Sequence, residues 1–144
     1  MPGPTEVRAF HAQRIAEFRA NGGKLGAPLA DIPLLILTTI GARSGQARST
    51  PVTYSTDGDR LVIIAANGGA TTHPDWYHNL VAHPEVTVEV GTETFQAQAA
   101  VATEPERTRL FNQHAARRPN FVEFQRQTAR QLPVIVLERV GSRV

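Results

Sequence analysis

The short connections between successive apolar runs are the feature that most constrains the fold of this chain. Residues 33–40 (PLLILTTI) are apolar almost throughout, which predicts a strand buried on both faces. A loop at 41–48 leads to a second predicted strand at 49–56, and the turn signal Asp-Gly-Asp at 57–59 leads to a third at 61–66. Parallel neighbours would need a crossover of about a dozen or more residues, so these connections predict an antiparallel sheet.

The remaining predicted elements are three further strands and four helices. Strands at 86–90 and 94–102 lie on either side of Gly91, as in a hairpin, and the last strand covers 133–140. Helices are predicted at about 5–21, at 73–83, from the capping-box sequence at 103–106 to about 118, and at 121–130. The order α-βββ-α-ββ-αα-β predicts an α+β fold, in which mainly antiparallel strands close a small β-barrel and flanking helices cover its openings.

Composition limits the class of protein. The chain has 144 residues, which fits a single domain over 1–144, and its apolar fraction of 41% is enough for one core. The absence of cysteine excludes disulfides, thiol nucleophiles and iron–sulfur clusters. The longest apolar run, 32–40, is too short to span a bilayer, and arginines recur where a signal peptide would need its apolar core. We therefore expect a cytoplasmic protein.

The basic charge does not favour a nucleic-acid partner. The net charge is only +2, and the arginines are spread along the chain rather than gathered into a stripe or a known motif. The predicted N-terminal helix carries Val7, Phe10, Ile15 and Phe18, and either docks on the core or makes peripheral contact with the inner face of a membrane. The sequence leaves both a monomer and a homodimer open.

The loop at 41–48 (GARSGQAR) is suited to an anion. Arg43 and Arg48 offer planar forks of donors that match phosphate or carboxylate. Gly41 and Gly45 let the backbone turn tightly and approach a ligand, and Ser44 adds a hydroxyl. A solvated hairpin loop with two surface arginines is the competing interpretation.

Other catalytic chemistries lack their residues. His73, His78 and His83 are spaced by five, and each step turns a helix by about 140° relative to the last, so they fan around it instead of sharing a face as metal ligands do. Residues 41–45 read GARSG, which is not the GxSxG elbow of serine hydrolases, and neither a Walker A loop nor GxGxxG occurs. We expect no metal site and none of the common nucleotide folds.

The residues that remain suit a phosphorylated aromatic cofactor. Arg43 and Arg48 can bind its anionic tail, and the small residues at 65–69 end a strand where a flat ring could lie against the backbone. Trp76 is rigid and amphipathic, and Asn79 lies one turn later on the same predicted helix. Each residue alone has an ordinary structural explanation, so the prediction rests on their combination.

Taken together, these residues make the chain resemble the deazaflavin-dependent nitroreductase family, whose members are small split β-barrels that use coenzyme F420 and are distantly akin to FMN-binding barrels. The resemblance covers about residues 10–140 and is carried by FRANGGK at 18–24, LILTTIG at 35–41, RSGQ at 43–46 with Arg48 and Pro51, AANGGA at 65–70 and HPDWYHNL at 73–80. It implies an oxidoreductase that transfers a hydride from the reduced coenzyme, an 8-hydroxy-5-deazaflavin, to a small organic acceptor.

The resemblance also implies residue roles. The coenzyme's phosphate and carboxylate tail would be bound by Arg43, Ser44, Gly45 and Arg48. Its ring system would be lined by Pro51, Val52 and Thr53, met at its edge by Ala65, Ala66 and Asn67, and held on its ribityl side by Trp76 and Asn79.

Two departures from the family pattern bear on ligand choice. Asn67 stands where many relatives carry a lysine, which removes one cationic contact with the coenzyme. Positions where relatives that reduce nitroimidazoles carry tyrosines hold other residues here, so an apolar pocket suited to quinones or enones is predicted and nitroimidazole reduction is not. The residues predicted to line this pocket are Thr53, Ala66, Arg118, Phe121 and Phe124.

Quinone or enone reduction also needs a proton after hydride transfer. The candidate donors are Tyr54, Ser55, His78 and water. Tyr54 and Ser55 point to opposite faces of a strand, so at most one of them faces the pocket. Two other functions stay open at this point: an FMN-dependent reductase on the same barrel, and a non-catalytic carrier of the coenzyme or another ligand.

Overall fold

The computed structural model describes residues 4–23 and 32–140. Its elements in chain order are α1 (Pro4–Ala20), β1 (Leu34–Ile40), β2 (Ala47–Thr53), β3 (Ser55–Asp57), β4 (Arg60–Ile64), the short 3-10 helix η1 (Asn67–Gly69), α2 (Asp75–Ala82), β5 (Glu85–Val90), β6 (Glu93–Val101), α3 (Glu106–Arg117), α4 (Asn120–Arg126) and β7 (Val134–Arg139). The strands of this described part form one antiparallel sheet in the order β2-β1-β5-β6-β7-β4-β3.

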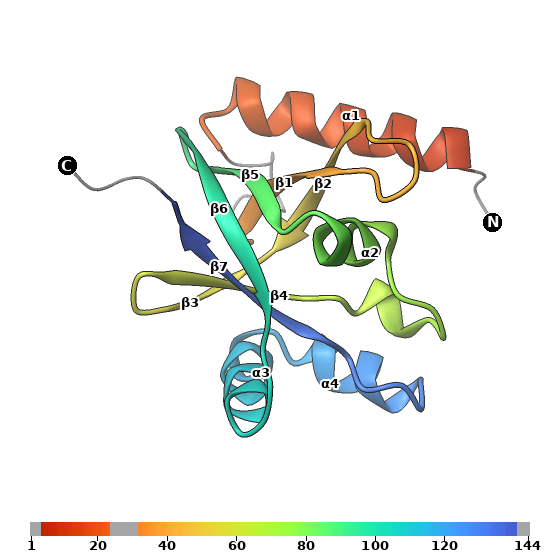
Figure 1. Ribbon diagram of the computed structural model, residues 1–144, viewed down its shortest axis with the longest axis vertical. Helices are drawn as coiled ribbons and strands as arrows, with labels where there is room; N and C mark the ends of the chain where they lie inside the picture. The colour runs from red at the N-terminus through yellow and green to blue at the C-terminus, as the bar shows by residue number, and fades with distance from the viewer. Residues whose placement is uncertain (1–3, 24–31, 141–144) are drawn as a thin grey trace.

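The two edges of this sheet are joined by a single residue, which forces the sheet to curl. β2 and β3 lie at opposite ends of the strand order, yet only Tyr54 separates them in the sequence. Seven flat strands about 4.8 Å apart would hold their edges roughly 29 Å apart, whereas two steps along the chain span at most about 7 Å. The sheet therefore closes on itself without a ladder between β2 and β3, and forms the predicted split β-barrel (Figure 1).

Side-chain alternation divides the core into an inner and an outer part. Leu35 and Leu37 of β1 pack inside the barrel, where Ile63 of β4 joins the same cluster. Ile36 and Val62 point outward and belong to two separate clusters beneath helices. The strands therefore bury both faces, as the nearly continuous apolar run at 33–40 predicted.

Helices cover the outer faces and one mouth of the barrel. Ile15 and Phe18 of α1 pack against Ile36, and Phe18 is only 1% exposed. α3 and α4 cover the outer side of β4 and β7, on the opposite side of the barrel from α1 (Figure 1). Leu80 of α2 belongs to the inner cluster, so α2 covers one open end of the barrel.

The docked interpretation of the N-terminal helix is therefore correct for Ile15 and Phe18. The side chains of Val7 and Phe10 lie outside the described ones, as does all of Lys24. None of the helices in the described ranges is long and apolar enough to cross a membrane. The helix ends as predicted at an Asn-Gly-Gly sequence, where Gly22 and Gly23 have φ values of +66° and +91°.

The prediction of one strand at 49–56 is wrong. The chain leaves one edge of the sheet at Thr53 and joins the opposite edge at Ser55, so the segment contains parts of two strands, and the barrel has seven strands instead of six. No glycine or proline marks the break at Tyr54. The break results from closure of the barrel, which depends on contacts remote in the sequence.

Two helix boundaries also differ from prediction. α3 begins at Glu106 without a cap from the Thr103 side chain; instead the Glu104 carboxylate accepts the Thr108 N–H at 2.9 Å. The predicted helix at 121–130 ends at Arg126. The four residues that leave this helix include Arg130, whose side chain reaches the site described next.

Candidate cofactor site

The β1–β2 hairpin loop is held in a fixed shape by its glycines. The Gly41 N–H donates to the Gln46 carbonyl at 2.8 Å, and the Gly45 N–H donates to the Gly41 carbonyl at 3.0 Å. A Cβ on Gly41 would lie 2.4 Å from Ser44 Oγ, and Gly45 has a φ of +70°. Ser44 Oγ accepts the Gln46 N–H at 3.1 Å, which leaves its hydroxyl proton available to a ligand.

Asn79 fastens this loop to α2. Its side chain is 8% exposed; Oδ1 accepts the Ala42 N–H at 2.9 Å, and Nδ2 donates to Thr39 Oγ1 at 3.1 Å. The amide therefore sets the position of the loop relative to the helix. One N–H of Nδ2 is left over, so the predicted contact with the coenzyme stays a prediction alongside this structural role.

Arg43 and Arg48 bring positive charge to the same place. Arg48 is paired with Thr39 across the β1–β2 ladder, so the two side chains lie on one face of the sheet, next to Asn79. Arg43 is exposed on the loop. Neither arginine forms an ion pair with any residue in the described ranges. Two guanidiniums without carboxylate partners on one hairpin are suited to bind an anion.

The turn that follows β4 lies at the same end of the barrel as this loop. Four successive antiparallel pairings separate β1 from β4, so the two strands run in the same direction and end at the same mouth of the barrel. The loop follows β1, the turn at 65–70 follows β4, and α2 connects them because it begins just after the turn and is bonded to the loop through Asn79. The structure thus brings the predicted tail and ring-edge residues to one mouth.

The turn at 65–70 presents backbone donors. Its φ values are positive at Asn67, Gly68 and Gly69, at 50°, 64° and 84°. The Gly69 N–H donates to the Ala66 carbonyl at 2.9 Å, and the Ala70 N–H donates to the Asn67 carbonyl at 3.1 Å. No acceptor among the described residues takes the N–H groups of Asn67 and Gly68. Adjacent free N–H groups of this kind bind carbonyl or anionic oxygens.

The backbone explains the asparagine at position 67. Asn67 is the one non-glycine residue with positive φ in the described ranges, and asparagine tolerates this conformation better than long side chains do. Its Nδ2 donates to the Thr72 carbonyl at 3.0 Å and closes the turn. The side chain therefore has a structural role, and the loss of a cationic contact at this position stays a prediction.

Arg130 is a site residue that the sequence did not reveal. Its guanidinium donates to carbonyl oxygens on both sides of the turn and to His73, which lies two residues before α2. No motif near Arg130 in the sequence indicates this role, because a helix over 121–130 would have directed its side chain away from the turn. Only the observed helix end at Arg126 lets it reach the turn.

The start of α2 adds aromatic surface beside the turn. Trp76 is half-buried and packs against the inner core. His73, Tyr77 and His78 form a ring cluster with centroids 4.5 to 5.7 Å apart. Burial, and then the charge of Arg130, lowers the pKa of His73. An aromatic surface of this kind is suited to a flat conjugated ring.

β2 does not present its three predicted ring contacts on one face. Val52 packs against the inner core, whereas Pro51 is paired with the outward-pointing Ile36 and lies on the other face with Thr53. β2 is an edge strand, which also accommodates the proline. The three residues could contact one ligand together only along this open edge.

The structure brings together most of the residues that were predicted to line the substrate pocket. Ala66 and Phe121 are buried in one apolar cluster, against which Phe124 packs. The ring centroids of Phe121 and Phe124 are 5.3 Å apart. Arg118 directly follows α3, and its Nε is buried without a partner among the described residues. Thr53 ends β2 at the other end of the barrel from Ala66, so it does not join them.

The candidate proton donors separate as alternation predicted. Tyr54 packs against the inner core, whereas Ser55 turns outward beneath α3. Ser55 Oγ is 2.8 Å from Nδ1 of His114, a fully buried residue whose pKa is lowered to about 4 by burial and by the charge of Arg118. The Ser55 hydroxyl is therefore engaged away from the site, and His78 is exposed on α2.

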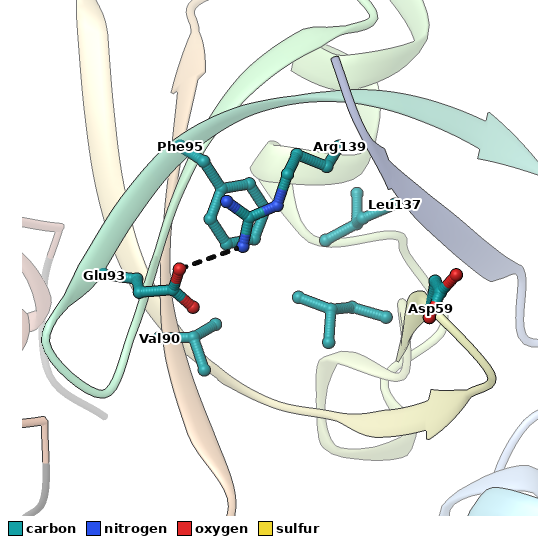
Figure 2. Close-up of a pocket in the computed structure, with 7 residues that line it drawn as sticks. Asp59, Val90, Glu93, Phe95, Leu137 and Arg139 are labelled. Atoms are coloured by element: carbon teal, nitrogen blue, oxygen red, sulfur yellow. Dashed lines mark hydrogen bonds and ion pairs between the residues drawn. The ribbon is translucent and has the colours of Figure 1, made fainter. Parts of the chain in front are cut away.

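A cavity of about 110 Å³ lies at the opposite mouth of the barrel. Leu61 at the start of β4 and Val90 at the end of β5 form part of its wall, so it is remote from the turn at 65–70. Arg139 lies 3.9 Å above the Phe95 ring and bonds Glu93 at 3.3 Å across its rim (Figure 2). Because this cavity lies at the mouth opposite the hairpin loop and the turn, it is not part of the candidate site.

The mouth formed by the hairpin loop, the turn and α2 fits an anionic aromatic cofactor. Arg43, Arg48 and the Ser44 hydroxyl can hold a phosphate or carboxylates. The Asn67 and Gly68 N–H groups can meet the carbonyl edge of a ring system. This donor set contains no nucleophile placed against a base, so the residues are suited to bind and orient a cofactor that itself carries the redox chemistry.

Comparisons of the sequence with known proteins identify a family. A family model described as F420H2-dependent quinone reductase matches residues 11–139. An F420H2-dependent quinone reductase of Mycobacterium tuberculosis is 38% identical over 130 residues, which cover 86% of each chain.

Solved structures share the fold. One whose title describes a domain-swapped dimer has a TM-score of 0.71 and 30% identity, and the match covers 94% of this chain and 100% of that one. An F420H2-dependent reductase, FDR-A, has a TM-score of 0.68 and 31% identity over 74% of this chain and 94% of its own. A haem storage protein of Vibrio cholerae, 15% identical with a TM-score of 0.58, shows likeness of fold alone.

Proposed function

The chain belongs to the F420H2-dependent quinone reductase family, and we propose that it uses reduced coenzyme F420 to reduce a quinone. It is an oxidoreductase of the split β-barrel class, and its acceptor is a small molecule. The preference for quinones that the Phe121 and Phe124 positions predicted agrees with the name of the family.

One observation supports the proposal above all others: unpaired cationic and backbone donors meet at a single barrel mouth. Arg43 and Arg48 have no ion pair with a described residue, and the Asn67 and Gly68 N–H groups have no described acceptor. Donors that the protein itself does not use are available to a ligand, and here they lie together.

We assign the residues as follows. Arg43, Arg48 and Ser44 hold the anionic tail, and the Asn67 and Gly68 N–H groups hold the carbonyl edge of the ring. Bound in this way, the reduced deazaflavin supplies a hydride from its central ring carbon. The protein orients the ring, and the apolar side chains of the neighbouring cluster offer a water-excluding surface for a flat acceptor.

The proton that follows the hydride comes from solvent or from a group at the mouth. Ser55 is bonded to His114 beneath α3, and Tyr54 follows Thr53 at the opposite mouth, which leaves His78 among the predicted side-chain donors. His78 is the exposed member of the ring cluster, so water reaches its imidazole.

Assembly is part of the proposal. The likeness to a structure titled as a domain-swapped dimer supports a homodimer, which sedimentation of the purified protein tests. Peripheral membrane contact through α1 stays a prediction, and co-sedimentation with anionic lipid vesicles tests it.

Binding and turnover test the function together. Purified protein is titrated with oxidised F420 and, separately, with FMN, by fluorescence quenching. Reduced F420 is then supplied with menadione, with an enone or with a nitroimidazole, and its reoxidation is followed. We expect binding of F420 and turnover with menadione; tight binding of FMN alone would contradict the proposal, and F420 binding without turnover would indicate a carrier.

Two alanine variants distinguish the loss of a specific contact with F420 from the general loss of one positive charge. Arg48→Ala should weaken F420 binding by about 1.5–3 kcal/mol, because a charge-assisted contact is lost. Arg117→Ala, which removes an exposed arginine of α3, should leave the affinity unchanged. Equal losses in both variants would mean that the tail binds elsewhere.

A further inference from the structure

We propose that Arg130 is a positioning residue that aims the Asn67 N–H at the coenzyme ring. This inference rests on the proposed function, because it assumes that the turn at 65–70 meets the ring. It assigns the orientation of that donor to one side chain outside the turn.

All three guanidinium nitrogens of Arg130 donate hydrogen bonds to the turn. Its Nη2 donates to the Ala66 carbonyl at 2.7 Å, and its Nη1 donates to the Ala65 carbonyl at 3.1 Å. Its Nε donates to the Ala70 carbonyl at 2.9 Å, so the guanidinium is hydrogen-bonded to both ends of the turn. Nη1 also lies 2.9 Å from Nδ1 of His73.

The direction of the Asn67 N–H follows from the planarity of the peptide bond. The Ala66 carbonyl and the Asn67 N–H belong to one trans peptide unit, in which the two groups point in opposite directions. Because Arg130 holds the carbonyl, the N–H must point away from the guanidinium, and no acceptor among the described residues takes it. A cation on the carbonyl side also polarises the peptide and strengthens its N–H as a donor.

Arginine is required for this arrangement. Its planar fork places separate N–H groups on several oxygens at once, whereas a lysine ammonium is a point charge without such a fork. Arg130 has no carboxylate partner in the described ranges, so its bonds to the turn are its main fixed interactions. Arg126, four residues earlier, instead pairs with Glu123 on the surface and provides a matched control.

The contact with His73 gives a readout that does not depend on the coenzyme. Arginine only donates, so Nδ1 of His73 must accept and the ring proton must sit on Nε2. The neutral Nε2–H tautomer of His73 therefore reports that Arg130 is in place. Nitrogen NMR of the histidine ring distinguishes the two tautomers in the protein without ligand.

The binding experiment compares the complete coenzyme with its ring-and-ribityl fragment, which lacks the phosphate and carboxylates. Arg130→Lys and Arg130→Ala should weaken binding of both ligands by the same factor, about tenfold for alanine, because the ring contact is affected. Arg48→Ala should weaken binding of the complete coenzyme only. Arg126→Ala should change neither affinity.

The fitted number of binding sites and the thermal midpoint separate positioning from general stability, because a folded Arg130 variant should keep the full number of sites and bind both ligands more weakly. A variant that is merely less folded would lower the active fraction without favouring one ligand, and its thermal midpoint and its fitted number of sites would show this. Arg130→Lys keeps the charge and serves as the second variant if Arg130→Ala does not fold. We expect both Arg130 variants to lose the pure Nε2–H tautomer of His73.

The outcomes are distinct. If the wild-type protein binds no F420, the proposed function fails, and the ring readout of His73 still tests the contact. If the wild type binds F420 and the folded Arg130 variants bind the ring fragment as tightly as it does, the positioning role is refuted. Loss of binding for the complete coenzyme alone would place Arg130 at the tail and would equally overturn the inference.

Discussion

Replacing His114 with glutamine should remove a loss of stability that the wild-type protein suffers in mild acid. His114 is 0% exposed and its Nδ1 is bonded to Ser55 Oγ. Burial, and then the charge of Arg118, lowers its pKa from the ordinary 6.5 to about 4. Below pH 6.5 the unfolded chain takes up a proton that the folded protein still refuses, so the free energy of unfolding falls as the pH falls.

The size of the effect follows from the two pKa values. Each unit of difference is worth about 1.4 kcal/mol, so the loss reaches about 3 kcal/mol near pH 4 and amounts to about 2 kcal/mol at pH 5. Above pH 6.5 His114 is neutral in both states and contributes no pH dependence. The window therefore lies between pH 6.5 and about 4.

Urea unfolding at about pH 7.5, 6 and 5 measures this term in the wild type, in His114→Gln and in His83→Gln, where His83 is exposed. The altered contact with Ser55 lowers the free energy of unfolding of His114→Gln by the same amount at every pH. The difference between wild type and this variant should shrink or reverse toward pH 5, and the His83 variant should follow the wild type. A difference between wild type and His114→Gln that stays the same at every pH would refute the reasoning.

Two further predictions concern the candidate site. Asn79→Ala releases the Ala42 N–H of the hairpin loop, and should weaken F420 binding several-fold, by about 1 kcal/mol, in the titration used for the arginine variants. Gly69→Ala should lower the thermal midpoint and the F420 affinity, because Gly69 has a φ of +84° and a Cβ there would lie 2.7 Å from Gln127 Oε1. Gly58→Ala is its control: φ is +62° but the space is open, so only the backbone strain remains and the affinity should not change. Equal affinity in the Gly69 and Gly58 variants would contradict the role of the turn.

Local patterns predicted the parts of the fold that local forces determine. The apolar run at 33–40, the turn at 57–59 and the Asn-Gly-Gly stop after α1 each predicted an element that the structure contains. The division between β2 and β3 at Tyr54 was not predictable in this way. It follows from the meeting of two sheet edges, which depends on the register of five other strands.

The site residues also differ in whether their neighbours in the sequence reveal their role. Glycines and arginines at 41–48 predicted an anion loop, because turn geometry and charge are readable from neighbouring residues. Arg130 was missed, because its partners at Ala65, Ala66 and Ala70 are at least 60 residues away in the sequence. Ser55 was a reasonable proton donor by type, and only its bond to His114 removes it from the mouth.

The position of bound F420 on the protein tests the proposed site most directly. Backbone amide NMR spectra of the wild type are compared before and after addition of oxidised F420. We expect shifts concentrated in the hairpin loop at 41–48, at the Asn67 and Gly68 amides and in α2. Shifts concentrated instead around Val90 and Phe95, at the opposite mouth of the barrel, would contradict the proposed site.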